Sequence, residues 1–293
     1  MRKLMKWLGL LLLVLVVAAA GVFALAWQRS EAGLARIYAV EDAPLTLPTD
    51  AVSLEHGRHL FETRGCSGCH GEGGRGALVM DAGPLLRLVA PNITPAQLTQ
   101  RGYTPDTVAR AVRHGVRADG RPLVFMPSDD WSELSDADTA ALVAYMQTLP
   151  DVDHDPGPIE IRPLSRVLYL LGQFPLIPAE HINHQARTRG APAVAATAEY
   201  GAYVARMCVG CHRPGLIGGA PLAPNTPPVA DLTPRALGAW SEADFFRAMR
   251  EGKRPDGRAI DPFMPWPMFA KLSDIELRAI WLHLQSLPPA PAS

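Results

Sequence analysis

The chain has 293 residues, a length that suggests about two domains, and 48% of its residues are hydrophobic, enough to form buried cores. Its formal net charge is −1 at pH 7, so nothing indicates a nucleic-acid surface or another strong electrostatic footprint. The 28 prolines and the low share of charged residues, 19%, favour long connecting segments between folded units.

The N-terminal segment is typical of a single membrane-spanning helix. Arg2, Lys3 and Lys6 precede an uncharged stretch that runs from Trp7 to Trp27. As a helix this stretch is roughly 31 Å long at about 1.5 Å per residue, which matches a hydrocarbon core of about 30 Å. Tryptophans at both ends fit the two membrane interfaces. We therefore expect residues 1–29 to anchor the chain in the membrane.

A cleaved signal peptide is the alternative, because Ala24-Leu25-Ala26 has the small-x-small form of a cleavage site. The apolar run is longer than the roughly 7–15 residues of an ordinary signal core, which favours the anchor. Both interpretations export the rest of the chain, since the positive flank stays in the cytoplasm. The expected location is the inner (cytoplasmic) membrane, single-pass, with residues 30–48 as a tether and the folded units in the periplasm.

The first folded unit is predicted over residues 49–150. A short helix enters it, with one face made of Leu54, Gly57, Leu60 and Phe61. A middle helix is predicted from Pro105 to Gly115 and a closing helix from Ser135 to Leu149. Ser135 is a plausible N-cap, Asp138 completes a capping box, and Pro150 ends the closing helix.

A pentapeptide of the form C-x-x-C-H occurs at residues 66–70 and again at 208–212. This is the attachment signature of a c-type haem. Two thiols three positions apart can both reach the vinyl edge of one porphyrin, and the histidine that follows then faces the iron. The motifs use all four cysteines of the chain, namely Cys66, Cys69, Cys208 and Cys211. We expect two covalently bound haem c groups, with His70 and His212 as iron ligands; a zinc knuckle, a thioredoxin-like pair and buried structural cysteines are the alternatives.

Residues 151–196 are predicted to be a proline-rich connector. Its middle, from Val167 to Ile177, is apolar but too short to span a membrane. Two interpretations remain open at this point. The connector packs into the groove between the two units, or it forms a patch that contacts the bilayer or a partner subunit.

The second unit, predicted over residues 197–290, repeats the plan of the first. Leu134 to Pro150 aligns without a gap on Leu272 to Pro288, and Glu276 takes the capping-box position. The equivalent helices run from Thr197 to Met207, from Ser241 to Glu251 and from Ser273 to Leu287. Two turns also match between the units: Asn92-Ile93-Thr94-Pro95 with Asp231-Leu232-Thr233-Pro234, and Asp119-Gly120-Arg121 with Asp256-Gly257-Arg258.

The same alignment predicts the second iron ligands. It places Phe125-Met126-Pro127 on Phe263-Met264-Pro265, so Met126 and Met264 share both position and context. A thioether is a soft, neutral ligand, and His/Met ligation raises the reduction potential of a haem. Met268 is the competitor in the second unit, but it aligns with Asp130 and therefore lacks a counterpart.

These motifs and turns resemble the class I cytochrome c domain, twice over, within residues 49–150 and 197–288. The chain is similar to membrane-anchored di-haem cytochromes c that serve as electron-transfer subunits of periplasmic dehydrogenases. The resemblance implies an all-α fold, with an N-terminal transmembrane helix followed by two tandem cytochrome c domains. In each domain the entry and closing helices cross, and iron is held by His70 with Met126 or by His212 with Met264.

Two six-coordinate haems leave no iron position for a substrate, which favours an electron carrier without a catalytic residue of its own. Its expected place is in a respiratory chain, between a periplasmic or membrane dehydrogenase, or a quinol-oxidising complex, and a terminal oxidase or soluble cytochrome. The alternatives are a di-haem enzyme of the peroxidase or thiosulfate-oxidising type, and a haem subunit of a terminal oxidase. A cysteine-ligated haem would need a fifth cysteine, and the chain has four.

Overall fold

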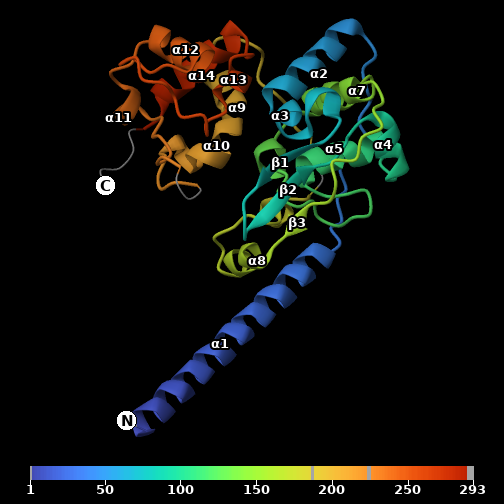
Figure 1. The fold of residues 1–293 in the computed structure, drawn as a ribbon. Coiled ribbons are helices and arrows are strands. Elements are labelled where there is room, and N and C mark those ends of the chain that lie inside the picture. Colours follow the sequence, from blue (N-terminus) through green and yellow to red (C-terminus); the bar gives the residue numbers. More distant parts are fainter. Residues whose placement is uncertain (1, 186–187, 223–225, 289–293) are drawn as a thin grey trace.

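The computed structural model describes residues 2–185, 188–222 and 226–288. A long N-terminal helix projects from two mostly helical lobes, the first coloured blue to green and the second orange to red (Figure 1). The fold is mainly α, as the sequence predicts. Three short strands in the first lobe were not anticipated.

The helices of the N-terminal segment, the first lobe and the connector are α1 (Arg2–Ala35), α2 (Ala51–Thr63), α3 (Cys66–His70), α4 (Pro95–Gln100), α5 (Pro105–His114), α6 (Ser128–Trp131), α7 (Asp136–Met146) and α8 (Pro163–Leu170). Those of the second lobe are α9 (Ala198–Val204), α10 (Arg206–His212), α11 (Pro234–Leu237), α12 (Glu242–Glu251), α13 (Trp266–Phe269) and α14 (Asp274–Ser286). The strands are β1 (Ala77–Asp81), β2 (Leu86–Ala90) and β3 (Glu160–Ile161).

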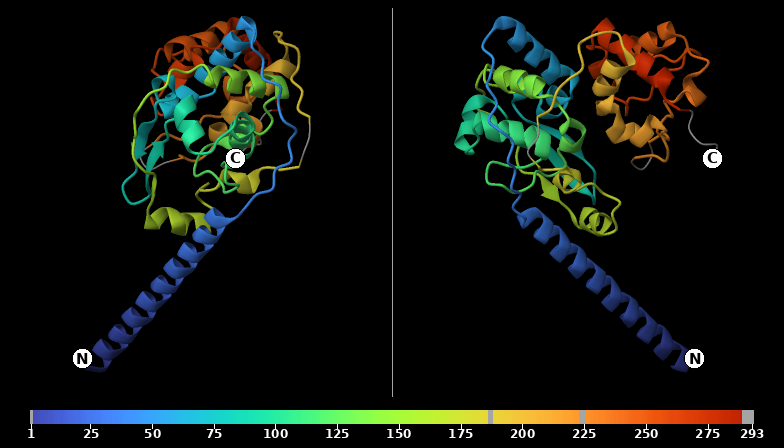
Figure 2. Two further views of the ribbon diagram at one scale, coloured as in Figure 1. Left: turned by 90° about the vertical axis from the view of Figure 1, so that its right-hand side faces the viewer. Right: turned by 180° about the vertical axis from the view of Figure 1, so that it is seen from behind.

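Helix α1 is long and apolar enough to cross a membrane by length and composition. It continues beyond Trp27 to Ala35 without a break. Its final turns carry buried small residues, Ser30 and Gly33, which pack against α8 of the connector. The views in Figure 2 agree that α8 lies beside the end of α1. The helix therefore reaches the folded lobe directly.

In each lobe the entry helix and the closing helix cross at a glycine. A Cβ atom at Gly57 of α2 would overlap the carbonyl oxygen of Ala141 in α7. In the second lobe a Cβ atom at Gly201 of α9 would overlap the carbonyl oxygen of Ala279 in α14. Only hydrogen at Cα permits this backbone contact, so equivalent glycines set the same crossing in both lobes.

The connector completes the first lobe. Its strand β3 pairs antiparallel with β2, and β2 pairs with β1, which gives the order β1-β2-β3. Further along, Leu176 and Ile177 form a small core with Tyr38 from the segment after α1 and Val116. The apolar middle of the connector is therefore buried against this lobe at its C-terminal end.

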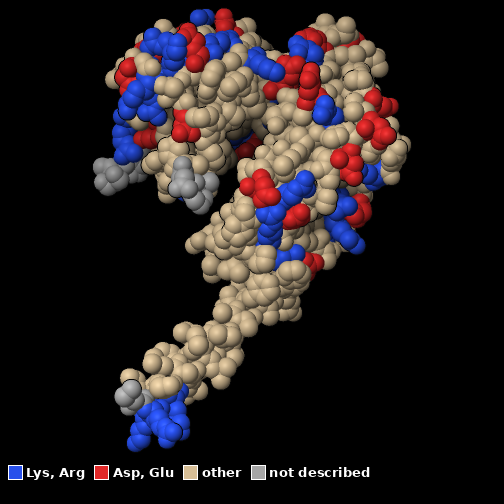
Figure 3. Space-filling model, in the orientation of Figure 1, with Lys and Arg blue, Asp and Glu red and all other residues tan. Residues whose placement is uncertain are grey.

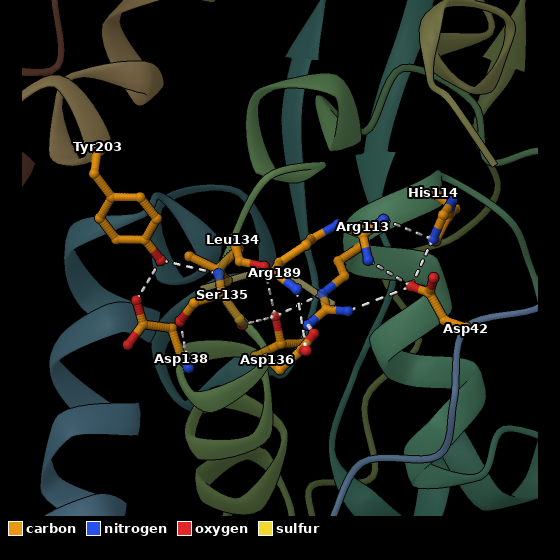
Figure 4. Close-up of polar contacts among 10 residues, drawn as sticks. Asp42, Arg113, His114, Leu134, Ser135, Asp136, Asp138, Arg189 and Tyr203 are labelled. Atoms are coloured by element: carbon orange, nitrogen blue, oxygen red, sulfur yellow. Dashed lines mark hydrogen bonds and ion pairs between the residues drawn. The ribbon is translucent and has the colours of Figure 1, made fainter. Parts of the chain in front are cut away.

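A buried polar network fastens the segment after α1 to the same lobe (Figure 4). One carboxylate oxygen of Asp42 accepts hydrogen bonds from His114 at 2.8 Å, Arg189 at 2.9 Å and Arg113 at 3.3 Å. The Arg113 side chain is 2% exposed and also pairs with Asp136 of α7. Burial alone would raise the pKa of Asp42, but the His114 hydrogen bond and the two guanidinium groups lower it overall. The network joins four chain segments that are far apart in sequence.

Replacing Asp42 with alanine is expected to lower the free energy of unfolding by about 2–3 kcal/mol, because two buried guanidinium groups lose an ionic partner. A guanidinium titration followed by circular dichroism measures the change. Glu41→Ala removes the same charge from an exposed neighbour and should leave the midpoint almost unchanged. Equal effects of the two substitutions would contradict a structural role for the Asp42 network.

Candidate functional site: the two haem-attachment motifs

The two pentapeptides form short helices at equivalent places in the two lobes. Helix α3 is the first pentapeptide, and the second forms the C-terminal part of α10. All four cysteines are free, with the first of each pair partly buried and the second exposed. The entry helix expected from Thr197 to Met207 in fact ends at Val204, and α10 begins after Ala205. Each motif therefore lies in a short helix that is separate from the entry helix of its lobe.

Each histidine of the motifs is held by a backbone carbonyl group. His70 donates from Nδ1 to the oxygen of Pro91 at 2.8 Å, and His212 donates from Nδ1 to the oxygen of Ala230 at 2.8 Å. Burial lowers the pKa of both imidazoles, which keeps them neutral. With the proton fixed on Nδ1, the Nε2 lone pair is left for a metal. This is the arrangement that an iron-bound haem ligand needs.

The repeated Asn/Asp-x-Thr-Pro turn explains how those carbonyl groups are placed. Pro91 and Ala230 each precede the turn directly. Within it the side chain of Asn92 accepts from the Thr94 amide at 3.0 Å, and Asp231 accepts from the Thr233 amide at 2.8 Å. The match between the repeats thus marks the backbone that orients the histidines, a role that the sequence comparison did not assign.

The zinc alternative does not fit the cysteines. A structural zinc site takes four thiolate or imidazole ligands, whereas each motif supplies two thiols and one imidazole. Among the residues that the structure describes, no group of three or more His, Cys, Asp and Glu side chains could hold a metal ion. The paired thiols and the oriented imidazole fit a covalently attached haem in each lobe, which supplies one-electron chemistry at its iron.

The two Met-Pro segments adopt the same local conformation. Pro127 has φ −76° and ψ 56°, and Pro265 has φ −79° and ψ 52°. Met126 and Cys66 both pack against the core of the first lobe, and Met264 and Cys208 both pack against the core of the second, as does Met268. Met126 and Met264 thus each line the same core as the first cysteine of the motif in their own lobe.

Met268, the alternative iron ligand in the second lobe, lies close to the first lobe. Its Sδ atom lies 3.3 Å from the position of a Cβ at Gly65, the residue before the first motif. The equivalent residue Asp130 of the first lobe packs against Gly210 inside the second motif. Equivalent positions therefore meet opposite motifs, and the two attachment helices lie at one interface between the lobes.

Two further equivalent pairs cross this interface. His59 of α2 bonds Glu276 of α14 at 2.8 Å, and Tyr203 of α9 donates to Asp138 of α7. His59 and Tyr203 each follow a crossing glycine by two residues, so the contacts are reciprocal, as in a two-fold interface. The lobes are docked by approximate two-fold symmetry. No sequence pattern within one repeat could predict this, because the partners lie in different repeats.

The interface changes one predicted cap. Ser135 is the N-cap of α7, as expected, and its side chain accepts from the Asp138 amide. However, the Ser135 amide donates to the Tyr203 hydroxyl at 3.0 Å, and the Asp138 carboxylate bonds His56 and Tyr203. The capping box predicted there is wrong, since the interface uses both groups. The box predicted at Ser273 and Glu276 is confirmed.

Glu276 is the buried acid of this interface. Burial alone would raise its pKa, but the His59 hydrogen bond and the Arg64 charge, 3.9 Å away, lower the pKa to about 2. The ordinary value is 4.5. The ionised carboxylate therefore stabilises the docked lobes at neutral pH, and this contribution is lost as the pH falls from about 4.5 toward 2.

Glu276→Gln is expected to reduce stability at pH 7 by about 2 kcal/mol, since His59 and Arg64 lose their anionic partner. The variant should also lose less stability than the wild type on acidification through that window. Denaturant midpoints measured against pH test both points. Glu199→Gln, at an exposed site, is the matched control and should follow the wild type. If the stability of Glu276→Gln fell with pH as steeply as that of the wild type, Glu276 would not be the acid that stabilises the docked lobes.

Comparison with known proteins agrees with this site. A family model described as "Cytochrome C oxidase, cbb3-type, subunit III" matches residues 52–146, and one described as "Cytochrome c" matches residues 198–288. Each match contains one attachment motif, so the two lobes are two cytochrome c domains.

Several similar curated proteins are cytochrome subunits of dehydrogenases. The chain is 27% identical over 264 residues to the fructose dehydrogenase cytochrome subunit of Gluconobacter japonicus, covering 80% of this chain and 53% of that protein. It is 28% identical over 278 residues to the alcohol dehydrogenase (quinone) cytochrome c subunit of Gluconacetobacter polyoxogenes, covering 85% and 58%. The cbb3-type cytochrome c oxidase subunit CcoP of Helicobacter pylori (strain 52) is 29% identical over 100 residues, covering 34% and 29%. The chain thus spans little more than half the length of the first two relatives.

The two family matches, the two complete attachment motifs and the oriented histidines lead to one assignment. The chain belongs to the c-type cytochromes and is a di-haem cytochrome c with one covalent haem c in each of its two domains.

Proposed function

We propose that the chain carries electrons from a membrane-bound or periplasmic dehydrogenase, through its two haems, to a terminal oxidase or a soluble cytochrome. The observation that carries this proposal is the common interface of the two attachment helices, where Met268 meets Gly65 and Asp130 meets Gly210. An arrangement that brings two haem sites to one interface favours electron passage between them. The chain itself is a carrier and contributes no catalytic residue.

The proposed iron ligands are His70 with Met126 in the first domain and His212 with Met264 in the second. The fixed Nδ1 protons and the matching Met-Pro conformations support this set. A thioether raises the potential of each haem and occupies its second axial position. Both features suit a carrier and leave no iron position for peroxide, so they weigh against the di-haem enzyme alternative.

The proposed location is the inner membrane, with α1 as a single span and both domains in the periplasm. The apolar length of α1 and the basic residues Arg2, Lys3 and Lys6 at its start support this orientation. The domains are proposed over residues 49–150 and 197–290. Membrane attachment would keep them at high local concentration near a membrane-bound donor.

A dehydrogenase is the favoured donor, because relatives that match most of this chain are cytochrome subunits of dehydrogenases. Purification of the full chain from membranes in mild detergent tests this. We expect a dehydrogenase to co-purify and its substrate to reduce both haems. The proposed donor would be overturned if no dehydrogenase co-purified, or if the substrate of the co-purified dehydrogenase reduced neither haem.

An oxidase subunit is the second candidate, because the first domain matches the model of the cbb3-type oxidase subunit. The same preparation separates the two functions. Oxygen consumption that depends on a copper- and haem-containing core, without a dehydrogenase, would favour the oxidase subunit.

A further inference from the structure

Helix α8 is fixed against the last turns of α1 by one arginine. The Arg166 guanidinium lies 3.9 Å from the centroid of the Trp27 ring, and it pairs with Glu31 at 2.7 Å and with the Ser30 hydroxyl. Its side chain is 7% exposed. The contact needs small residues on α1, since a Cβ at Gly33 would lie 2.7 Å from the Tyr169 hydroxyl. The position of α8 along α1 is therefore well defined.

The opposite face of α8 is apolar and exposed. Leu164 is 40% exposed and Leu171, just past the end of the helix, is 59% exposed. Together with the partly buried Leu168 they follow the spacing i, i+4, i+7 and share one face. Ser165 and Arg166 are buried on the other side. In Figure 3 the surface beside the upper end of the anchor is largely tan, without a continuous charged patch.

The depth of this face follows from Trp27. That residue ends the uncharged stretch of α1, where an aromatic side chain sits at the level of the lipid headgroups. Because Arg166 stacks on the same ring, α8 lies at that level as well. Phe23 and Trp27 of α1 are themselves 39% and 46% exposed, so an apolar surface is present on both helices.

We propose that α8 is an interfacial helix, with its Leu164–Leu168–Leu171 face in the headgroup and acyl-chain boundary of the bilayer. The inference rests on the proposed membrane span of α1. Helices of this kind bury one apolar face in the boundary while their polar side stays in contact with water or protein. Here the polar side is bound to α1, and β3 and the Tyr169–Glu180 hydrogen bond at 2.8 Å join α8 to the first domain. The first domain would thus be held at a fixed height above the membrane.

The native cysteines allow a direct test, because both pairs are used in thioether bonds. A single added cysteine in the full haem-loaded chain can then be labelled with a nitroxide. Leu171→Cys is the test site, Leu12→Cys marks the span, and Val52→Cys on α2 is an exposed apolar control. Figure 1 shows α2 on the far side of the first domain from α1. Electron paramagnetic resonance in phosphatidylcholine–phosphatidylglycerol vesicles then compares collisions with oxygen and with a water-soluble nickel complex.

The label at residue 171 should collide with the nickel complex several-fold less often than the label at residue 52, and it should show a depth between residues 52 and 12. A water-exposed label at residue 171 together with a buried label at residue 12 would overturn the interfacial helix alone and leave this face to a partner subunit. Water exposure at both residues 171 and 12 would overturn the membrane span and the interfacial helix together.

Discussion

Gly57→Ala is expected to destabilise the first domain by more than about 3 kcal/mol, because the new methyl group would overlap the carbonyl oxygen of Ala141. The same Cβ would also lie 2.8 Å from the Cβ of Tyr145. Neither contact can be relieved by rotating a side chain, so α2 and α7 must move apart. A guanidinium titration of the haem-loaded protein, followed by far-ultraviolet circular dichroism, measures the loss.

Two variants make this experiment specific. Gly201→Ala creates the equivalent overlap with Ala279. It should lower the guanidinium concentration at which the second domain, rather than the first, unfolds. Gly190→Ala is the control, since nothing lies within 4 Å of its added Cβ and its backbone is not left-handed. Midpoints for Gly57→Ala and Gly190→Ala that coincide would show that the helices do not cross as closely as described.

Met264→Leu is expected to remove the sulfur ligand from one haem only. Half of the absorbance of the sulfur-to-iron charge-transfer band should disappear, and one of the two reduction potentials should fall, because thioether ligation raises the potential. Leucine preserves the volume of the side chain and its contacts with the core of the second domain. The absorption spectrum of the oxidised protein measures the band, and an optical redox titration measures the two reduction potentials.

Met126→Leu should give the same result for the other haem, and the double variant should abolish the band. Met268→Leu is the matched control, because that side chain packs against the same core but also approaches Gly65 of the first domain and aligns with Asp130 in the repeat. Its spectrum should match the wild type. A band of full intensity in Met264→Leu, together with a band of half intensity in Met268→Leu, would reverse the ligand assignment in the second domain.

Much of the architecture could be predicted from local sequence patterns. The helices that bear the caps Thr104, Ser241 and Ser273 begin where the sequence places them, since a cap depends on neighbouring residues alone. The C-x-x-C-H motifs specified the cofactor for the same reason. Internal repetition then supplied the equivalent positions in the two domains.

The parts that could not be predicted depend on contacts between distant segments. Strand β3 is only two residues long, Glu160 and Ile161, and has no periodicity to detect. Asp42 lies in what was expected to be a simple tether, and its partners come from α5 and the connector. Tyr203 takes the Ser135 amide that a capping box within α7 would have used. In each case a tertiary partner decided the outcome.

The pairing of β2 with β3 has a consequence for the order of biosynthesis. The first domain needs Glu160 and Ile161 for its sheet, Leu176 and Ile177 for its small core, and Arg189 for the Asp42 network. In the proposed periplasmic location, export from the N-terminus would deliver the first attachment motif long before these segments. The chain would then present Cys66 and Cys69 for haem attachment while the surrounding domain is incomplete, and the connector would close that domain afterwards.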